Sequence, residues 1–308
     1  MKTGTGHTDK NIFTGITLAV VATLIWSGNF IIARRVFGQI PPVSLAFFRW
    51  LTATIIMLPI GYRGVSREYA FIRKRWSYFI WAAFTGVTVF NTLVYIAGHS
   101  TTAINLSLIG TTSSPIMAIF LARVFLKERI GIYKVIGMIL CITGILFLLS
   151  GGSWGRLMRF HFSRGDIWVL LAGFTFAVYS VLVRRKPAGV SPNSFLLVIF
   201  TLGTLLLLPF FLVEWFSSPP IKWDAWLLGD ILFLGLGASV ISFYCWNRAI
   251  AYLGAGRTSL FGNLIPIFSS LEAVFILGEI FTPIHAFSMV LVFAGLILAN
   301  LKSVVRTR

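Results

Sequence analysis

Residues 13–33 read FTGITLAVVATLIWSGNFIIA, and this stretch decides the class of fold. It holds no charged residue and lies between Lys10 and Arg34. A helix needs about 20 mainly apolar residues to cross a membrane, whereas the apolar region of a cleavable signal peptide is about 7–15 residues long. The stretch therefore predicts a first membrane helix that the protein retains.

The composition of the whole chain agrees with that first stretch. Of the 308 residues, 57% are hydrophobic and only 11% are charged, and the mean hydropathy is +0.88. A soluble domain carries about 25% charged residues, and a disordered chain combines low hydrophobicity with high charge. A transmembrane barrel would show alternating strands of about ten residues rather than long apolar runs. We therefore expect an all-α integral membrane protein.

Ten apolar runs are long enough to be membrane spans, and short gaps marked by Gly, Pro or basic residues separate them. No gap exceeds about 15 residues and no GxxxxGK[ST] loop is present, so we expect no soluble domain and no ATP site. The predicted spans are 13–34, 43–62, 76–97, 104–126, 131–150, 166–184, 193–213, 228–247, 257–278 and 283–302.

The distribution of basic residues predicts the orientation. The chain has 26 Lys and Arg against 9 Asp and Glu, a net charge of +17. With a cytoplasmic N-terminus, 19 of the 26 basic residues fall in segments on the inside, 6 fall outside, and Arg49 lies within a span. Cytoplasmic segments carry such an excess. We therefore expect cytoplasmic tails at 1–12 and 303–308, and no nucleic-acid partner.

An internal duplication runs through the chain. Punctuating residues recur in the same order at an offset of 150 or 151, which predicts two five-span repeats, 13–150 and 165–302. Because five is odd, the second repeat enters the membrane from the opposite side, as in many secondary transporters. A duplicated structural protein is the alternative. The matching pairs are Gly15/Gly165, Pro42/Pro192, Gly86/Gly237, Pro115/Pro266, Glu128/Glu279 and Gly144/Gly295.

Three local motifs carry a family resemblance. The first span contains Trp26-Ser27-Gly28-Asn29-Phe30, the second Phe47-Phe48-Arg49, and the ninth ends in Leu277-Gly278-Glu279. The chain resembles the EamA-type ten-helix members of the drug/metabolite transporter superfamily, and is most similar to the YddG-type exporters of aromatic amino acids. Leu126-Lys127-Glu128 departs from the family pattern at its Gly. The resemblance implies helices around a central cavity with the fifth and tenth spans outside it, export, and the bacterial inner membrane.

Polar and aromatic residues within spans are the candidates for a substrate cavity. A polar group that faces lipid costs several kcal/mol unless it is paired, so these side chains should face the bundle interior or the cavity. The duplication maps Trp26 and Asn29 onto Phe176 and Tyr179, which would place related aromatic positions across a pseudo-twofold axis. Anchoring at the membrane interface or helix–helix hydrogen bonding remains the alternative for each. The candidates are Trp26, Asn29, Asn91, Tyr95, Asn105, Thr111, Tyr179, Tyr244, Trp246 and Asn263.

Four charged residues need separate explanations. Arg49 and Glu272 are the charges that lie well inside spans, and we expect them to interact, directly or through water. The alternative is that Arg49 binds backbone carbonyls while Glu272 is protonated or faces the cavity alone. Glu128 and Glu279, which follow the repeated Pro115 and Pro266, are expected to be structural, each favouring the positive end of a helix that begins nearby. A gating salt bridge is the alternative for that pair.

The sequence thus predicts a secondary transporter that exports amino acids, aromatic and other neutral or apolar ones, across a bacterial inner membrane. A multidrug or other small-metabolite exporter is the alternative within the class, and a non-transporting receptor or assembly protein is the alternative outside it. No grouping of Ser, His, Cys or acidic residues suggests catalysis, so we expect no enzyme activity, no cofactor and no metal. The expected partners are amino acids and the lipid bilayer, and the expected oligomeric state is a monomer.

Overall fold

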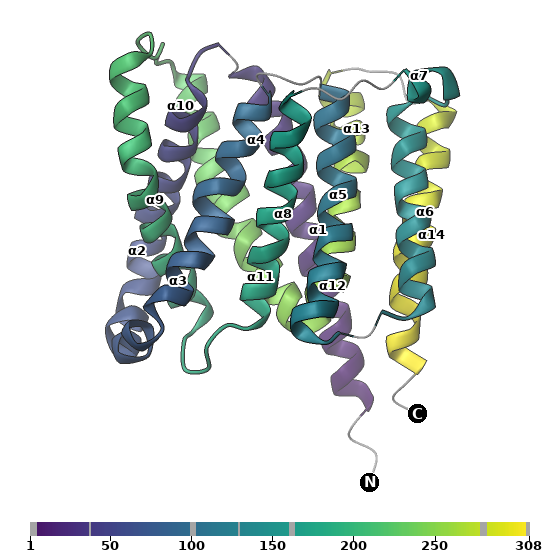
Figure 1. Cartoon of the computed structure of the whole chain (residues 1–308), viewed down its shortest axis with the longest axis horizontal. Coiled ribbons are helices and arrows are strands. Elements are labelled where there is room, and N and C mark those ends of the chain that lie inside the picture. The colour runs from purple at the N-terminus through teal and green to yellow at the C-terminus, as the bar shows by residue number, and fades with distance from the viewer. Residues whose placement is uncertain are drawn as a thin grey trace.

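The computed structural model describes residues 5–36, 38–98, 103–128, 130–159, 164–277 and 282–305, and within them every regular element is a helix (Figure 1). The first half contains α1 (Thr5–Arg35), α2 (Pro42–Lys74), α3 (Trp76–Ala83), η1 (Phe84–Val89), α4 (Phe90–Gly98), α5 (Ala103–Leu126), α6 (Ile132–Leu149) and the short α7 (Trp154–Met158). The second half contains α8 (Arg164–Arg184), α9 (Pro192–Ser217), α10 (Ala225–Phe233), η2 (Leu234–Ile241), α11 (Ser242–Leu253), α12 (Ala255–Thr258), η3 (Ser259–Leu264), α13 (Ile265–Leu277) and α14 (Pro283–Val305).

Local sequence signals set several helix ends. Pro42 and Pro192 open α2 and α9, where the missing N–H and the fixed φ of proline cost nothing. Asp224 caps α10, because its carboxylate accepts from the N–H of Leu227 at 2.7 Å. Gly254 ends α11 in the left-handed region, with φ at 86°. These signals end or begin helices in the segments that were predicted to lie between membrane spans.

The second helix is longer than the predicted span 43–62. α2 continues as one helix to Lys74, so the basic segment 63–75, expected to be a loop, is mostly a helical extension. No proline interrupts it after Pro59, and its Arg, Glu and Ala residues favour helix. The short α7 was likewise not predicted.

Six helical segments are long and apolar enough to cross a membrane by length and composition, among the residues that the structure describes. Shorter apolar helices cover Ser113–Leu126, Ile132–Leu148 and Pro283–Ala299. Large apolar side chains cover the outside of the bundle, as Phe120, Phe210 and Val290 do with exposed fractions above 60%. A water-soluble monomer rarely exposes so much apolar surface, so the outer face suits lipid. The six segments are Asn11–Asn29, Pro42–Lys74, Trp76–Ala97, Arg164–Arg184, Pro192–Ser217 and Ala225–Leu253.

The two halves are related by a pseudo-twofold axis. Only residues near such an axis can contact their own repeat equivalents. Thr54 and Thr204, 150 positions apart, share a hydrogen bond of 3.2 Å where α2 packs on α9. Cys141 lies against its equivalent, Val292, where α6 packs on α14. The axis therefore passes through both of these helix pairs.

The second half of the chain starts at the opposite end of the bundle from the first. Figure 1 shows both termini at the lower end, together with the turn between α2 and α3, whereas α6 leads up to α7 at the upper end and α8 begins there. An odd number of helical passes in each half produces this reversal. The basic residues 63–75 and the two termini consequently share one end.

Candidate functional site

A cavity of about 100 Å³ lies between the two halves of the chain. Its walls come from α1, α2, α4 and α5 of the first half and from α8, α11, η3 and α13 of the second. In secondary transporters built from repeats, the solute site lies at this kind of junction. The lining residues are Trp26, Asn29, Arg49, Phe90, Asn91, Val94, Ser114, Pro115, Val169, Ala172, Gly173, Phe176, Trp246, Ser259, Gly262 and Ile265.

Arg49 is the polar centre of this cavity. Its side chain is only 1% exposed and is held by neutral groups from several helices. Nη1 donates to Asn29 Oδ1 at 3.0 Å, to Asn91 Oδ1 at 2.8 Å and to the Tyr95 hydroxyl at 2.9 Å. A buried charge is tolerated only with such hydrogen bonds or with a counter-ion. Among the described acidic side chains, none forms an ion pair with Arg49.

A π-helical turn in the second half supplies the remaining partners of Arg49. Within η2, the Ala238 carbonyl accepts from Arg49 Nη2 at 3.0 Å and from Trp26 Nε1 at 2.8 Å. The Ser239 hydroxyl accepts from Arg49 Nε at 2.7 Å and donates to the Leu234 carbonyl, five residues back. Wider π turns weaken the regular backbone ladder and are frequent at functional sites. Here the irregular turn presents a carbonyl to side chains of the first half.

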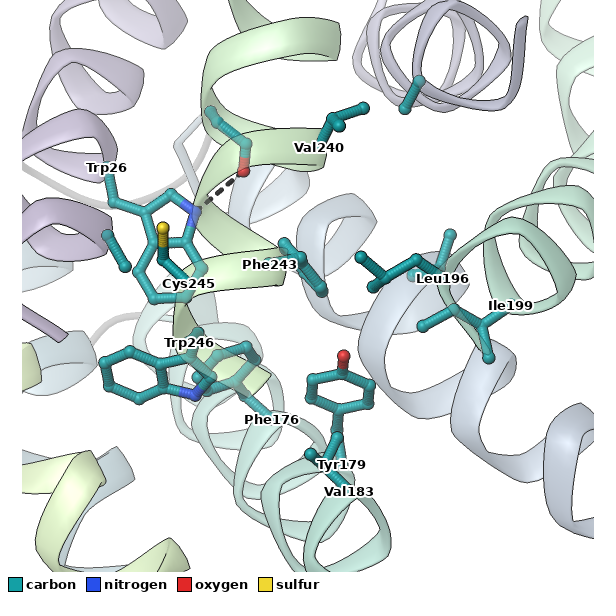
Figure 2. Packing of buried hydrophobic residues seen from close by; sticks show 14 of the residues in the cluster. Trp26, Phe176, Tyr179, Val183, Leu196, Ile199, Val240, Phe243, Cys245 and Trp246 are labelled. Atoms are coloured by element: carbon teal, nitrogen blue, oxygen red, sulfur yellow. Dashed lines mark hydrogen bonds between the residues drawn. The ribbon is translucent and has the colours of Figure 1, made fainter. Parts of the chain in front are cut away.

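Aromatic rings from both halves also line the cavity. Trp26 packs edge-to-face on Phe176 with centroids 5.6 Å apart, and its ring lies 5.0 Å from that of Trp246 (Figure 2). Trp26 and Phe176 are repeat equivalents, so these two related aromatic positions do meet across the axis. Each such pair contributes about 0.5–1.5 kcal/mol beyond the area it buries. The rings offer a flat apolar surface to a solute.

The two repeats contribute different side chains to the cavity, although they are related in sequence. At the offset of 150, Ile199 occupies the position equivalent to Arg49, and Tyr179 the position equivalent to Asn29. Ile199 is fully buried among apolar residues. A charged group of a solute would therefore meet Arg49 in the first half, whereas both halves supply apolar lining, such as Phe90 and Phe176.

The structure places the predicted cavity residues in different positions. Trp26, Asn29, Asn91 and Trp246 line the cavity. Tyr95 lies behind it as a partner of Arg49, while Tyr179 is fully buried and donates to Asn247 Oδ1 at 2.8 Å. Pro115 also lines the cavity, within α5, and Pro266 lies in α13. The side chains of Asn105 and Thr111 lie outside the described residues, as does Glu279.

Tyr244 and Asn263 do not lie where they were predicted to. Tyr244 is 38% exposed on the outer surface of the bundle. It follows Phe243, which faces the interior, and one step along a helix turns the side chain by about 100°. Asn263 is fully buried in η3 but does not line the cavity. The spacing of residues along a helix can distinguish inward-facing from outward-facing positions only when the inward face of that helix is known.

The direct ion pair predicted between Arg49 and Glu272 is not formed. Glu272 Oε1 instead accepts from the Ser27 hydroxyl at 2.6 Å, and Glu272 is not among the described residues that line the cavity. Arg49 binds two amides, two hydroxyls and one backbone carbonyl, so only its bond to Ala238 matches the alternative of binding backbone carbonyls. Two charges that both lie inside membrane spans therefore need not be neighbours.

Glu128 lies at the N-terminus of a helix, as predicted. That helix is α12 and not α6, the next helix in the chain. Its Oε1 accepts from the N–H of Ala255 at 3.2 Å, at the beginning of α12 in the other half. Its second oxygen lies 3.9 Å from Lys134 Nζ. The N-cap of α6 is Gly131, without a side-chain cap. Glu128 therefore joins the two halves at the end of the bundle that carries the termini.

Sequence reasoning missed two parts of the site. The Ala238 carbonyl and Ser239 bind Arg49, yet the sequence GASV at 237–240 contains no motif that would predict this. Ser114, Ser259 and Phe90 also line the cavity. The nearest signal was the recurrence of Gly86 as Gly237, since each glycine lies in one of the two π-helical turns.

An all-helical bundle with an apolar outside and a cavity between two related halves defines a membrane transporter of the two-repeat class. The chain belongs to the EamA-like transporter family, whose model matches it twice, over residues 13–150 and 163–301. The second match shows that the recurrence of glycines, prolines and glutamates reflects a true repeat.

Proteins similar to this chain carry transporter names. A protein of Archaeoglobus fulgidus named "uncharacterized transporter" is 26% identical over 290 residues, covering 92% of this chain and 96% of that relative. The Bacillus subtilis transporter YyaM is 28% identical over 94% of this chain and 90% of its own. A Streptantibioticus cattleyicolor protein named "probable terminal-alkyne amino-acid exporter" is 27% identical over 63% of each chain.

A solved crystal structure shares the fold. It aligns with a TM-score of 0.77 over 93% of this chain and 96% of its own, at 19% sequence identity. This likeness concerns the arrangement of helices alone.

Proposed function

We propose that the protein exports amino acids, aromatic and other neutral or apolar ones, from the cytoplasm by alternating access of the cavity between its two halves. The observation that carries this proposal is the lining of that cavity, which combines a hydrogen-bonded guanidinium and amides with aromatic rings. Amides and a guanidinium suit the polar end of an amino acid, and aromatic rings suit its side chain.

A bacterial inner membrane with both termini inside is part of this proposal. The basic segment 63–75 and both termini lie at one end of the bundle (Figure 1). Cytoplasmic ends of membrane proteins carry such an excess of Lys and Arg. The relative named as an amino-acid exporter adds support for this class of solute.

An efflux assay tests the proposal. Cells that express the protein are loaded with phenylalanine, leucine or glutamate, and the appearance of each amino acid in the medium is followed. We expect faster efflux of phenylalanine and leucine than in cells without the protein, and no change for glutamate. Phe176→Ala should slow export, because Phe176 lines the cavity.

A matched substitution on the outside provides the control. Phe210→Ala removes an aromatic ring of the same size from a position that is 62% exposed, so export should be unchanged. Export of drugs or other metabolites without amino acids would favour the other exporters of this class. Failure to move any solute would favour a receptor or assembly role.

A further inference from the structure

We infer that the cavity recognises a carboxylate, which Arg49 binds, and that the amino group of a solute contributes little to its affinity. This inference rests on the proposed function and names the chemical group on which recognition depends. It extends the solute class to apolar carboxylic acids without an amino group. Three observations support it: the charge of Arg49, the unused hydrogen-bond donors around it, and the composition of the lining.

The first observation is an uncompensated buried charge. Arg49 is 1% exposed, and each of its hydrogen-bond partners is neutral. In the described part of the lining, Arg49 is the one charged residue. A guanidinium is always protonated and matches the geometry of a carboxylate. A carboxylate that enters the cavity would supply the missing countercharge.

The second observation is that donors exceed acceptors. Arg49 Nη2 carries two hydrogens, of which the Ala238 carbonyl takes one. Asn91 Nδ2 and Trp246 Nε1 have no hydrogen-bond partner among the described residues, and both residues line the cavity. The oxygens of Asn29, Asn91 and Tyr95 already accept from Arg49. The site therefore calls for an acceptor, and a carboxylate is acceptor-only.

The third observation concerns the rest of the lining. No carboxylate that could bind an ammonium group belongs to its described residues, and Glu272 is engaged with Ser27 elsewhere. Phe90, Val94 and Phe176 instead offer apolar surface. Ring faces can attract a cation, but they carry no net charge to neutralise an ammonium group. An apolar body with one carboxylate thus matches the cavity better than an apolar amine.

Ligand binding by the purified protein tests the inference without requiring transport. Thermal unfolding of the full chain in detergent is measured with L-phenylalanine, with 3-phenylpropionate, which lacks the amino group, and with phenethylamine, which lacks the carboxylate. A ligand that binds only the folded state raises the midpoint. We expect phenylalanine and phenylpropionate to raise it and phenethylamine to leave it unchanged. Equal stabilisation by phenethylamine, or no stabilisation by either carboxylate, overturns the inference.

A near-isosteric substitution provides a second, independent test. Asn91→Asp places a carboxylate 2.8 Å from Arg49 Nη1, where it occupies the guanidinium without a loss of packing. We expect about 10- to 100-fold weaker binding of phenylpropionate, the range for a lost hydrogen bond to a charged group, while the ligand-free protein stays folded. Asn193→Asp adds the same charge in the first turn of α9, outside the cavity, and should leave binding unchanged. Unchanged binding in Asn91→Asp would overturn the inference.

The two hypotheses fail in different ways. If phenylalanine and phenylpropionate bind but neither leaves loaded cells, the proposed export is wrong and the carboxylate site stands. If phenylalanine is exported and phenethylamine binds as tightly as phenylalanine, the proposed export stands and the carboxylate site is wrong.

Discussion

Single side chains of the first half hold Arg49 in place. Asn29, Asn91 and Tyr95 come from two helices and converge on one nitrogen, Nη1, which has only two hydrogens to give. Because three acceptors share two hydrogens, the loss of one acceptor still leaves a partner for each hydrogen of Nη1. The orientation of the guanidinium, rather than its charge, is then the property that these residues control.

Tyr95→Phe removes one of these acceptors while keeping the ring. We expect folding stability to fall by about 1 kcal/mol, below the usual 1.5–3 kcal/mol for a hydrogen bond to a charged group, because the two amides still accept. Carboxylate binding should weaken as Arg49 becomes less fixed. Thermal unfolding and ligand titration in detergent measure both. Tyr62→Phe, at a residue that is 64% exposed, is the control, and an equal effect there would contradict the explanation.

The cost of placing polar groups in lipid was enough to predict part of the cavity lining, the candidate site, from sequence. It pointed to Asn29, Asn91 and Trp26 as inward-facing residues, and all three line the cavity. It could not identify the Ala238 carbonyl, because every residue has a carbonyl and only the local π turn makes this one available. The same argument could not show that Phe243 faces inward and Tyr244 outward, since the two lie on different faces of one helix.

At the scale of helices, α6 and α14 form a closely packed pair. A Cβ on Gly137 would lie 2.4 Å from the Gly295 carbonyl oxygen, and one on Gly144 would lie 2.9 Å from that of Ser288. The pseudo-twofold exchanges these two contacts, because Ser288 and Gly295 are the equivalents of Gly137 and Gly144 at the offset of 151. Small residues that let two backbones approach are a common basis of helix pairing in membranes.

Gly137→Leu should separate this pair. The nearest obstacle is backbone, which cannot move aside as a side chain can, so we expect a loss at or above the usual 1–3 kcal/mol of overpacking. The measurement is the yield of folded protein and its unfolding midpoint in detergent. Gly131→Leu serves as the control, since a Cβ there meets nothing within 4 Å. Equal losses in both variants would contradict close approach as the cause, since Leu favours helix more than Gly does and propensity alone would not destabilise Gly137→Leu.

Glu128 is expected to act as a structural link between the halves. In Glu128→Gln the side-chain oxygen can still accept from the N–H of Ala255, so export and folding should be nearly retained. Glu128→Leu removes that acceptor and should cost about 0.5–2 kcal/mol, as the loss of a helix cap does. Efflux and thermal unfolding are measured for both variants. A strong loss of efflux in folded Glu128→Gln would point to a gating salt bridge instead, in which Lys134 is the candidate partner.

The length and hydropathy of apolar runs predicted where the helices lie, because a membrane requires a minimum length and allows few charges. They did not predict where α2 ends, since the stretch beyond Pro59 is polar enough to leave the membrane and still favours helix. They also could not predict which helices pack together. That depends on small residues and ring contacts brought from distant parts of the chain.

At the scale of the whole molecule, the proposed orientation can be checked with two single cysteines. Met158, on α7, is 82% exposed, and Tyr69, near the end of α2, is 59% exposed. Figure 1 shows α7 at one end of the bundle and the turn that follows α2 at the other. A membrane-impermeant thiol reagent added to intact cells should label Met158→Cys and not Tyr69→Cys. Labelling of Tyr69→Cys alone would reverse the orientation.

The unsubstituted chain is the control for this labelling. Its two cysteines, Cys141 and Cys245, are both buried and free, so the background should be low. Disruption of the membrane should then expose Tyr69→Cys to the reagent. Continued absence of label after disruption would mean that this residue is covered in the membrane, and the adjacent Arg67→Cys would replace it.

The guanidinium of Arg49 in the cavity also affects which ions can leak through the protein. A carrier whose binding site opens to either face of a membrane risks a leak of protons or sodium ions, which would dissipate the membrane potential. A fixed positive charge in a narrow passage raises the electrostatic barrier to both ions. Arg49 would thus keep the passage tight to small cations in each cycle, including the empty return, while it attracts a negatively charged group.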